Sequence, residues 1–239
     1  MNKETYCAFI ADIVESTKMN EEKRRKVQEK IQDTINNFNE TYKESIAAQI
    51  YFSGGDQLQA LFESVSVAYA FACAFREELF PVEFRIGLGV GDWSLRFPGD
   101  NTNKQDGTSY HNARSAYEYA HKTGKNIMLK SGRDADAYIN VFASQEYAIF
   151  NMQSNMQKEA FKKYKEICPI KPAPQKTETG IISVHVDKVS QERIAEAVGT
   201  SRQNVGKLLK NGMIHEQRDL QGAIVLMLSR IFDEGKGIN

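Results

Sequence analysis

Two aspartates stand where short apolar segments end, and their placement suits the binding of a divalent cation. Asp12 ends the apolar segment 6–11, and Asp56 follows Gly54-Gly55 in a tight turn. Carboxylates that hold Mg²⁺ usually share the ion with phosphate oxygens, so this pair would indicate nucleotide chemistry. Two structural roles stay open. Asp12 could cap the helix that follows it, and Asp56 could simply occupy a hairpin turn.

Strands and helices alternate along the first part of the chain, and their order predicts the fold class. Apolar residues recur every three or four positions in the helical segments, whereas they cluster or alternate in the strands. The order β-α-β-β-α-β is typical of a ferredoxin-like α+β domain, with an antiparallel sheet and helices on one face. The expected elements are strand 5–14, helix 19–45, strands 46–53 and 57–62, helix 64–80, strand 82–92, a returning strand 93–97, helix 108–122 and strand 125–130.

One of these strands carries glycine at every second position. Gly87, Gly89 and Gly91 leave one face of segment 82–92 without side chains. A glycine repeat weakens a strand and often marks the close approach of a ligand or of another backbone. From the sequence, either a ligand or another backbone could lie against this face. Residues 134–166 show helical periodicity, but no chemistry is assigned to them.

A proline-rich segment divides the chain. Three of the five prolines lie between residues 169 and 174, so we expect a stiff linker over 168–187. This linker separates a sheet domain, residues 1–167, from a small all-α domain, residues 188–239.

Two short helices joined by a glycine turn are expected in the C-terminal domain. Ser190 and Ser201 are suited to cap them, and Gly199 to end the first. This pattern is typical of a DNA-binding helix-turn-helix, although a helical hairpin that only packs or dimerises would share it. Residues 188–218 carry six Lys or Arg against three Asp or Glu, a local surplus that favours DNA. The candidate DNA-contacting residues are Ser201, Arg202, Gln203, Asn204 and Lys207.

The last apolar segment, residues 216–233, has two interpretations. It would either complete the core of its domain or form the interface of a homodimer. A homodimer would suit two half-sites on duplex DNA, because a dimeric helix-turn-helix reads one half-site with each copy.

Composition limits the classes of partner and site. Lys plus Arg and Asp plus Glu number 31 each, so no global basic field draws the chain to nucleic acid. The three cysteines lack metal-ligand spacing, and Cys7 and Cys73 are expected to be buried thiols in a reducing cytoplasm. No apolar segment reaches the ~20 residues of a membrane span, and no signal peptide is expected. We therefore expect a soluble cytoplasmic protein without a membrane partner.

Four motifs, in order along the chain, resemble those of class III nucleotidyl cyclases. They are the segment from Asp12 to Thr17, the turn Gly54-Gly55-Asp56, the strand from Arg85 to Gly91, and the segment from Asp106 to Arg114. The Gly-Gly-Asp turn also resembles that of diguanylate cyclases and of the palm domain of CRISPR-type polymerases. Over most of its length the chain is similar to the SatD family of bacterial proteins, in which a cyclase-like domain precedes a C-terminal helix-turn-helix.

This resemblance implies a palm-like sheet domain that binds a nucleoside triphosphate together with Mg²⁺ or Mn²⁺. If the chain is an active enzyme, Asp12, Asp56 and Arg114 would be its catalytic residues. Phosphate would be held by the Arg114 guanidinium and by backbone N–H groups at the start of the long helix. The implied metal-site residues are Asp12, Ile13 and Asp56, and the implied nucleotide-binding residues are Val14, Glu15, Ser16, Thr17, Gly55, Asn112 and Arg114.

The sequence also departs from the cyclase pattern at two positions. Phe52 stands where cyclases have a lysine that recognises the base, and Tyr110 where they have an asparagine that steadies the transition state. The leading hypothesis is therefore a bacterial regulator that binds metal, nucleotide and DNA with little turnover. An active nucleotidyl cyclase or oligonucleotide synthase is the alternative, and a scaffold for protein contacts is the third hypothesis. His111 is expected either to be structural or to support a neighbouring residue of the site.

Overall fold

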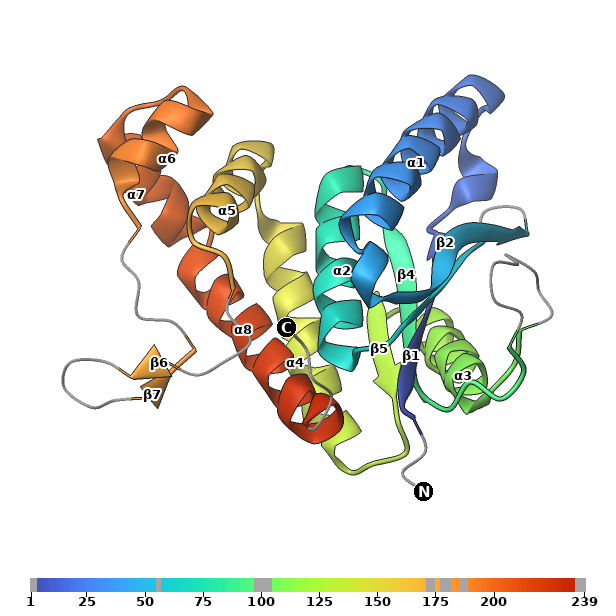
Figure 1. Ribbon diagram of the computed structural model, residues 1–239. Coiled ribbons are helices and arrows are strands. Elements are labelled where there is room, and N and C mark those ends of the chain that lie inside the picture. Colours follow the sequence, from blue (N-terminus) through green and yellow to red (C-terminus); the bar gives the residue numbers. More distant parts are fainter. Residues whose placement is uncertain are drawn as a thin grey trace.

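The protein folds into a five-stranded sheet with helices, followed by a group of helices at its C-terminal end (Figure 1). The computed structural model describes residues 4–54, 57–96, 105–170, 175–176, 182–184 and 189–234. The strands are β1 Tyr6–Ile13, β2 Ile46–Gly54, β3 Gln57–Phe62, β4 Phe84–Gly91, β5 Ile127–Lys130, and the short pair β6 Gln175–Lys176 and β7 Ile182–Ser183. The helices are α1 Glu21–Thr41, α2 Val65–Leu79, α3 Thr108–Thr123, α4 Ala135–Met152, α5 Asn155–Ile167, α6 Gln191–Val198, α7 Arg202–Asn211 and α8 Ile214–Leu228. Short 3₁₀ turns lie at Ser16–Lys18 and Lys43–Ser45, and a π-helical turn, Ser229–Asp233, follows α8.

The mixed α+β class expected from the sequence is confirmed, with one change in the sheet. The strand order is β2-β3-β1-β4-β5, and the pairs β2–β3, β1–β3 and β1–β4 are antiparallel. β5 instead runs parallel to β4. The reason is the connection, because α3 lies between the two strands in the chain and forms the crossover that parallel neighbours require. The sheet is therefore mixed rather than antiparallel throughout.

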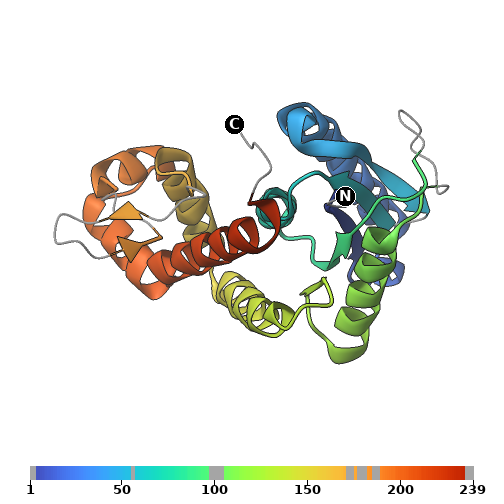
Figure 2. The same ribbon diagram turned by 60° about the horizontal axis from the view of Figure 1, so that its bottom comes forward.

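Helices cover both faces of the sheet, and not one face as expected (Figure 2). Successive side chains of β1 point alternately to the two faces of the sheet. Phe9 and its neighbours of the same parity pack into the main core with α1 and α2, whereas Ile10 faces the side on which α3 lies. The main core is rich in aromatic contacts. Phe71, for example, lies 5.1 Å from Phe9 between ring centroids in an edge-to-face arrangement.

The glycines of β4 explain how α3 reaches the second face. A Cβ atom at Gly89 would overlap the backbone of Ala113 and Ser109, and one at Gly87 would lie 2.5 Å from the backbone nitrogen of Tyr117. The bare face of this strand therefore receives the backbone of α3, which is the second of the two occupants that the sequence left open. No returning strand follows β4 in the sheet. Leu95 makes only an isolated bridge with Asp106, and Phe97 lies outside the described residues.

The packing does not divide at residue 167. Phe161 and Tyr164 of α5 form a second buried cluster with Ile194 of α6 and Val205 of α7. We call α5, α6 and α7 the C-terminal helical unit. α8 belongs to both parts of the protein, because its first residue, Ile214, lies in that cluster, whereas the other end of the helix enters the main core. The residues that enter it are Ile224, Val225 and Leu228, followed by Phe232. Of the two interpretations of segment 216–233, core completion is therefore confirmed, whereas a dimer interface on this segment stays a prediction.

A buried polar network fixes α8 against α2 and α4. The guanidinium of Arg76 donates two hydrogen bonds of 2.8 Å to the carboxylate of Glu146. Gln217 and Gln221 of α8 donate to the same carboxylate at 2.7 and 2.8 Å. These four side chains are each at most 2% exposed. Burial alone would raise the pKa of Glu146, but the Arg76 charge and the hydrogen bonds outweigh it and hold that pKa below its usual value.

Candidate functional site

Asp12 lies on β1, on the face of the sheet that α3 partly covers. It is half-buried, and its Oδ2 accepts a hydrogen bond of 3.0 Å from the hydroxyl of Tyr117 on α3. Its neighbours across the sheet are Gln57 of β3 and Arg85 of β4. Asp12 does not cap α1, because that helix begins at Glu21 and is capped by Asn20.

A cavity of about 270 Å³ opens beside Asp12, between α3 and the part of the sheet that α3 leaves uncovered. Its polar lining comes from two directions. Gln57 and Gln59 rise from β3, and the Arg114 side chain comes from α3. At the rim, Nε2 of His111 lies 3.0 Å from Oδ1 of Asp106. Because Gln57 is the strand partner of Asp12, the cavity and the carboxylate lie next to each other.

The amide groups of the cavity floor are held in a row. The hydroxyl of Tyr51 donates to Oε1 of Gln59 at 3.3 Å, and Nε2 of Gln59 lies 3.5 Å from Oε1 of Gln57. Arg114 is exposed, and among the described residues no acidic side chain forms an ion pair with it. The cavity therefore offers one guanidinium and oriented amides, with the carboxylate of Asp12 beside it and that of Asp106 at its rim beside His111. The guanidinium and the amides can donate to an anionic ligand with polar edges.

Several predicted residues fall outside what the structure describes. Gly55 and Asp56 lie outside the described residues, and the side chain of Thr17 does too. Ile13 is buried in the main core, on the face of β1 opposite to Asp12, so only its backbone is available to a ligand of that site.

The segment from Val14 to Thr17 does not begin the long helix. Its Ser16 starts a separate 3₁₀ turn before Asn20 caps α1. The backbone N–H of Val14 donates to the carbonyl of Glu83 at 2.9 Å. This N–H was predicted to bind phosphate, but it is not available to do so. Glu15 has a left-handed backbone, with φ of 57°.

Three residues of α3 and β2 have roles that the sequence did not reveal. The side chain of Asn112 donates to the carbonyl of Val90 at 2.8 Å, so it ties α3 to β4 and does not line the cavity. Phe52 packs against the main core. Tyr110 packs against the cluster on the α3 face, where burial and a smaller effect of Tyr51 raise the pKa of its hydroxyl well above the usual value.

A divalent cation fits this site only as an ion shared with a ligand. Among the described residues, no three His, Cys, Asp or Glu side chains gather as a metal-ion cluster. Mg²⁺ is commonly bound through one or two carboxylates, with phosphate oxygens and water completing the shell. Asp12 would supply one such carboxylate, and the second predicted carboxylate, Asp56, lies outside the described residues.

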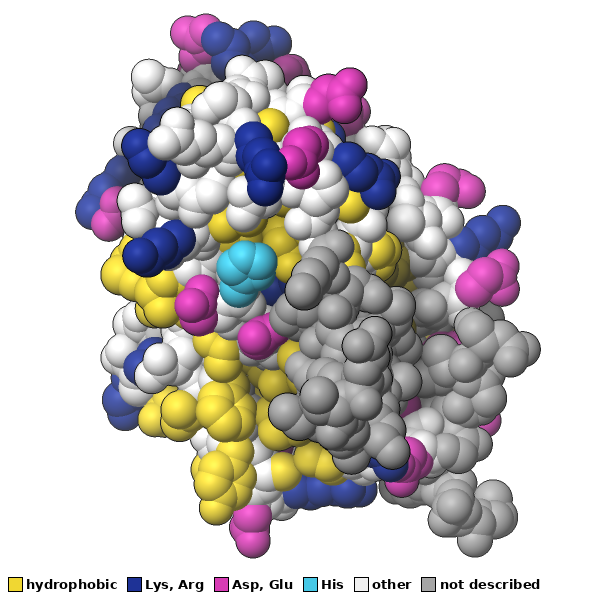
Figure 3. All heavy atoms as spheres, turned by 90° about the vertical axis from the view of Figure 1, so that its left-hand side faces the viewer, with side chains coloured by type: hydrophobic (Ala, Val, Ile, Leu, Met, Phe, Trp, Pro, Cys, Tyr) yellow, Lys and Arg dark blue, Asp and Glu magenta, His cyan; other side chains and the backbone are white. Residues whose placement is uncertain are grey.

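The second candidate surface is α7, which lies beside α6 in the C-terminal helical unit (Figure 1). Arg202, Gln203 and Lys207 are exposed there, as expected. Ser201 accepts from the backbone N–H of Asn204 at 3.2 Å and so caps α7. The Asn204 side chain donates to Thr200 Oγ1 at 2.8 Å, and Nε of Arg202 lies 2.9 Å from Glu192 of α6. Figure 3 shows basic side chains gathered over the upper part of the molecule, with acidic ones among them.

Sequence reasoning missed three parts of these sites. Tyr117, which holds Asp12, is one of several tyrosines on an amphipathic helix, and nothing in its spacing marks it. The glutamines of β3 alternate with apolar residues, which indicated an exposed face but no ligand. α5 was read as part of the sheet domain, although its buried face packs on α6 and α7. The two thiols expected to be buried, Cys7 and Cys73, are buried, and burial raises the pKa of Cys73 to about 12.

Comparisons with known proteins identify a family and similar solved structures. The sequence model of the SatD family matches residues 6–166. Among solved structures, a bacterial light-regulated adenylyl cyclase aligns at 12% identity and a TM-score of 0.36, over 54% of this chain and 77% of that one. No curated protein matches the chain. Within the described residues, no helix is both long and apolar enough to cross a membrane.

Proposed function

The chain belongs to the SatD family, and from this and the site geometry we propose that its sheet domain binds a nucleoside triphosphate with a divalent cation. We propose further that its C-terminal helical unit binds duplex DNA. The observation that carries the first proposal is the cavity in which Arg114 faces Gln57, the strand partner of Asp12. A phosphate chain beside Asp12 would place its oxygens between a cation and a guanidinium.

Binding without rapid turnover is the part of this function that the local structure favours. Phe52 is directed into the apolar core, so position 52 offers no donor to a base. Tyr110 presents a hydroxyl that burial keeps neutral, and it adds no charge to the site. Because a missing electrostatic stabiliser typically costs ~10²–10³ in rate, we expect slow or absent formation of cyclic or oligomeric nucleotides.

The test is a thermal shift titration of the full chain with Mn²⁺ and each nucleoside triphosphate. At least one triphosphate is expected to raise the Tm, and Asp12→Asn and Asp56→Asn are each expected to abolish that shift. Arg114→Ala is expected to weaken the affinity by about 10- to 100-fold, the value of one or two charged hydrogen bonds. Asp33→Asn and Arg25→Ala, both exposed on α1, are the matched controls and should leave the shift unchanged.

Two outcomes would contradict this proposal. A shift that survives Asp12→Asn would place the ligand elsewhere. Rapid, metal-dependent pyrophosphate release that is lost in the two aspartate variants would show an enzyme, and the chain would then be a nucleotidyl cyclase or oligonucleotide synthase rather than a sensor.

The proposal of DNA binding is supported by the exposed face of α7. Arg202, Gln203 and Lys207 share this face, and their types can contact base edges and phosphates. The test is fluorescence anisotropy with mixed-sequence duplexes at several salt concentrations. Arg202→Ala with Gln203→Ala should weaken binding and leave the Tm nearly unchanged, because both side chains are exposed. Equal weakening on every duplex would indicate phosphate contacts, and selective weakening base contacts. Undiminished binding would contradict the assignment of this face.

A further inference from the structure

The outer face of α4 carries exposed apolar side chains and no charge, although Gln145 and Asn151 are polar and exposed there. Tyr138 is 68% exposed, Val141 57% and Phe142 37%, and Met152 at the end of the helix is 72% exposed. The charged residues of α4 lie elsewhere. Glu146 is buried in the network with Arg76, and Asp136 is half-buried and accepts hydrogen bonds from Ser131. From residue 137 to residue 152, the exposed side chains therefore carry no charge, in a chain of which 26% is charged.

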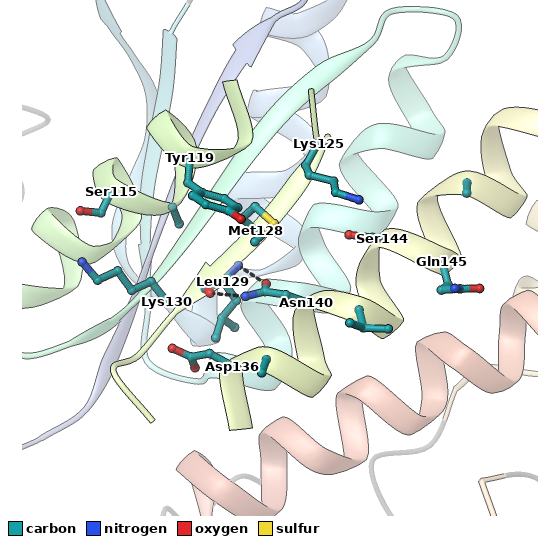
Figure 4. A pocket seen from close by; sticks show the side chains of 14 residues that line it. Ser115, Tyr119, Lys125, Met128, Leu129, Lys130, Asp136, Asn140, Ser144 and Gln145 are labelled. Atoms are coloured by element: carbon teal, nitrogen blue, oxygen red, sulfur yellow. Dashed lines mark hydrogen bonds between the residues drawn. The ribbon is translucent and has the colours of Figure 1, made fainter. Parts of the chain in front are cut away.

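A groove runs beside this face, between α4 and α3 and across β5 (Figure 4). Its volume is about 980 Å³. Met128 and Leu129 of β5 lie at its base, and Tyr119 of α3, 56% exposed, stands on the opposite wall. Figure 3 shows the same contrast on a larger scale, with hydrophobic side chains gathered at the lower left and charged ones above.

The edge of β5 in this groove is closed to a further strand. The side-chain amide of Asn140 accepts from the backbone N–H of Leu129 at 2.7 Å and donates to its carbonyl at 2.8 Å. A strand added at Leu129 would therefore have to displace the side chain of Asn140 from both backbone groups of this residue. The groove is left to receive side chains from a helix rather than an extended peptide.

We propose that this surface, the outer face of α4 with the α3–α4 groove, pairs with the same surface of a second copy of the chain. In a two-fold contact, the side chains that lie on the axis meet their own counterparts, so charges there would repel each other. A stripe without charge avoids that cost. The ridge formed by Tyr138, Val141 and Phe142 lies directly beside a groove, and this arrangement lets the ridge of each copy enter the groove of the other.

The charges and the size of the surface also suit a second copy of the chain. Lys125, Lys130 and Asp136 place both signs on the rim of the groove, which allows attraction at the edge of the contact. α4 is about 27 Å long and two adjacent helices are about 20 Å wide, so the surface covers roughly 540 Å² in projection. The accessible area of so ridged a surface exceeds this projection, and a standard interface buries ~800 Å² per partner.

If the C-terminal helical unit binds DNA as proposed above, pairing through α4 would also affect that binding. Only this link between pairing and DNA depends on the proposed function. α4 ends at Met152 and α5 begins at Asn155, so the C-terminal helical unit follows the pairing helix directly. A two-fold axis at α4 would hold two α7 helices at one fixed separation. Duplex DNA with two inverted half-sites would then bind both copies at once.

The first test is the mass of the full chain by analytical ultracentrifugation, between about 1 and about 100 µM, a range that covers weak dimers. The wild-type chain is expected to be a dimer at the upper end. Val141→Glu should be a monomer throughout, with an unchanged circular dichroism spectrum, because this side chain is exposed. Asn37→Glu, exposed on α1, adds the same charge elsewhere and should remain a dimer.

The second test detects the contact directly. The three native cysteines are buried, so an introduced exposed thiol reacts alone. Gln145→Cys, on the outer face of α4, should give a dimer with a short bismaleimide cross-linker, and Asn37→Cys should not. A wild-type chain that stays monomeric at the highest concentration would overturn the proposal, as would a Val141→Glu variant that still dimerises. Neither measurement needs nucleotide or DNA, so their failure would leave the proposed function untouched.

Discussion

At the scale of single residues, glycine decides where α3 can lie. The helix contacts β4 so closely that its backbone occupies the space of a side chain at Gly87, Gly89 and Gly91. This contact also brings Tyr117 to Asp12 and Arg114 to the cavity, because both Tyr117 and Arg114 lie on α3. The glycine repeat is therefore a positioning feature of the candidate site, although no glycine of β4 lines the cavity.

A pair of glycine substitutions tests this statement. Gly89→Ala should destabilise the fold by about 3 kcal/mol or more, because the new methyl group meets backbone that cannot move aside. For a chain of this length that loss lowers the Tm by roughly 10 °C. Gly206→Ala on α7 is the matched control. Its nearest neighbour would be the end of the Gln191 side chain at 3.6 Å, so it should be neutral or stabilise by up to about 1 kcal/mol. Differential scanning fluorimetry measures both, and equal effects would contradict the account of α3.

At the scale of elements, the interface between α8 and the sheet domain depends on one buried ion pair. Arg76 and Glu146 are buried, and Gln217 and Gln221 both donate to Oε1 of the carboxylate. Removing one partner of a buried pair leaves an uncompensated charge, which typically costs about 3–5 kcal/mol. Glu146→Gln should therefore lower the Tm strongly, whereas Glu118→Gln, exposed on α3, should not.

The same pair predicts a dependence of stability on pH. The pKa of Glu146 is lowered from its usual value of 4.5 in the folded protein. A lowered pKa stabilises the fold at pH values above 4.5, and the contribution is lost as the pH falls through the lower folded value. The wild-type Tm should consequently fall as the solution is acidified below the usual value, and Glu146→Gln should show a smaller fall. Parallel Tm curves for the two proteins would show that Glu146 does not contribute in this way.

The elements themselves were predictable where a single pattern determined them. β1 to β5 and α1 to α4 follow from alternation, from helical spacing and from turn residues, all of which act over a few positions. The parallel direction of β5 and the placement of α3 on the second face depend on contacts between distant segments. The buried network was hidden for a further reason. Arg76, Glu146, Gln217 and Gln221 are types that usually lie at the surface, and only their meeting inside the fold reveals them.

At the scale of the whole molecule, the two parts of the protein share one framework. α8 contributes to the buried clusters of both, and the π-helical turn after it returns to the sheet domain. There the carboxylate of Asp233 accepts hydrogen bonds from Ser64 Oγ at 2.8 Å and from the backbone N–H groups of Val65 and Ser66 at 3.0 Å. These bonds satisfy the first N–H groups of α2, which no residue within that helix can do. The sheet domain is therefore completed by residues far beyond the proline-rich segment.

This sharing predicts where the chain can be shortened. A chain that ends after Ile167 loses Ile224, Val225, Leu228 and Phe232 from the main core, together with Asp233. Each of these four apolar side chains contributes about 1.5–3 kcal/mol by burial, so their loss is comparable to the whole stability of a typical domain, about 5–15 kcal/mol. The shortened chain would also expose the core face of α2 and leave Glu146 without its two glutamine partners. We expect it to lack a cooperative thermal transition.

A chain that ends after Glu234 keeps every described contact of α8 and should unfold at the same temperature as the full chain. Circular dichroism melting of the two shortened chains decides the matter, because a cooperative transition in the chain ending at Ile167 would mean that the sheet domain folds without α8.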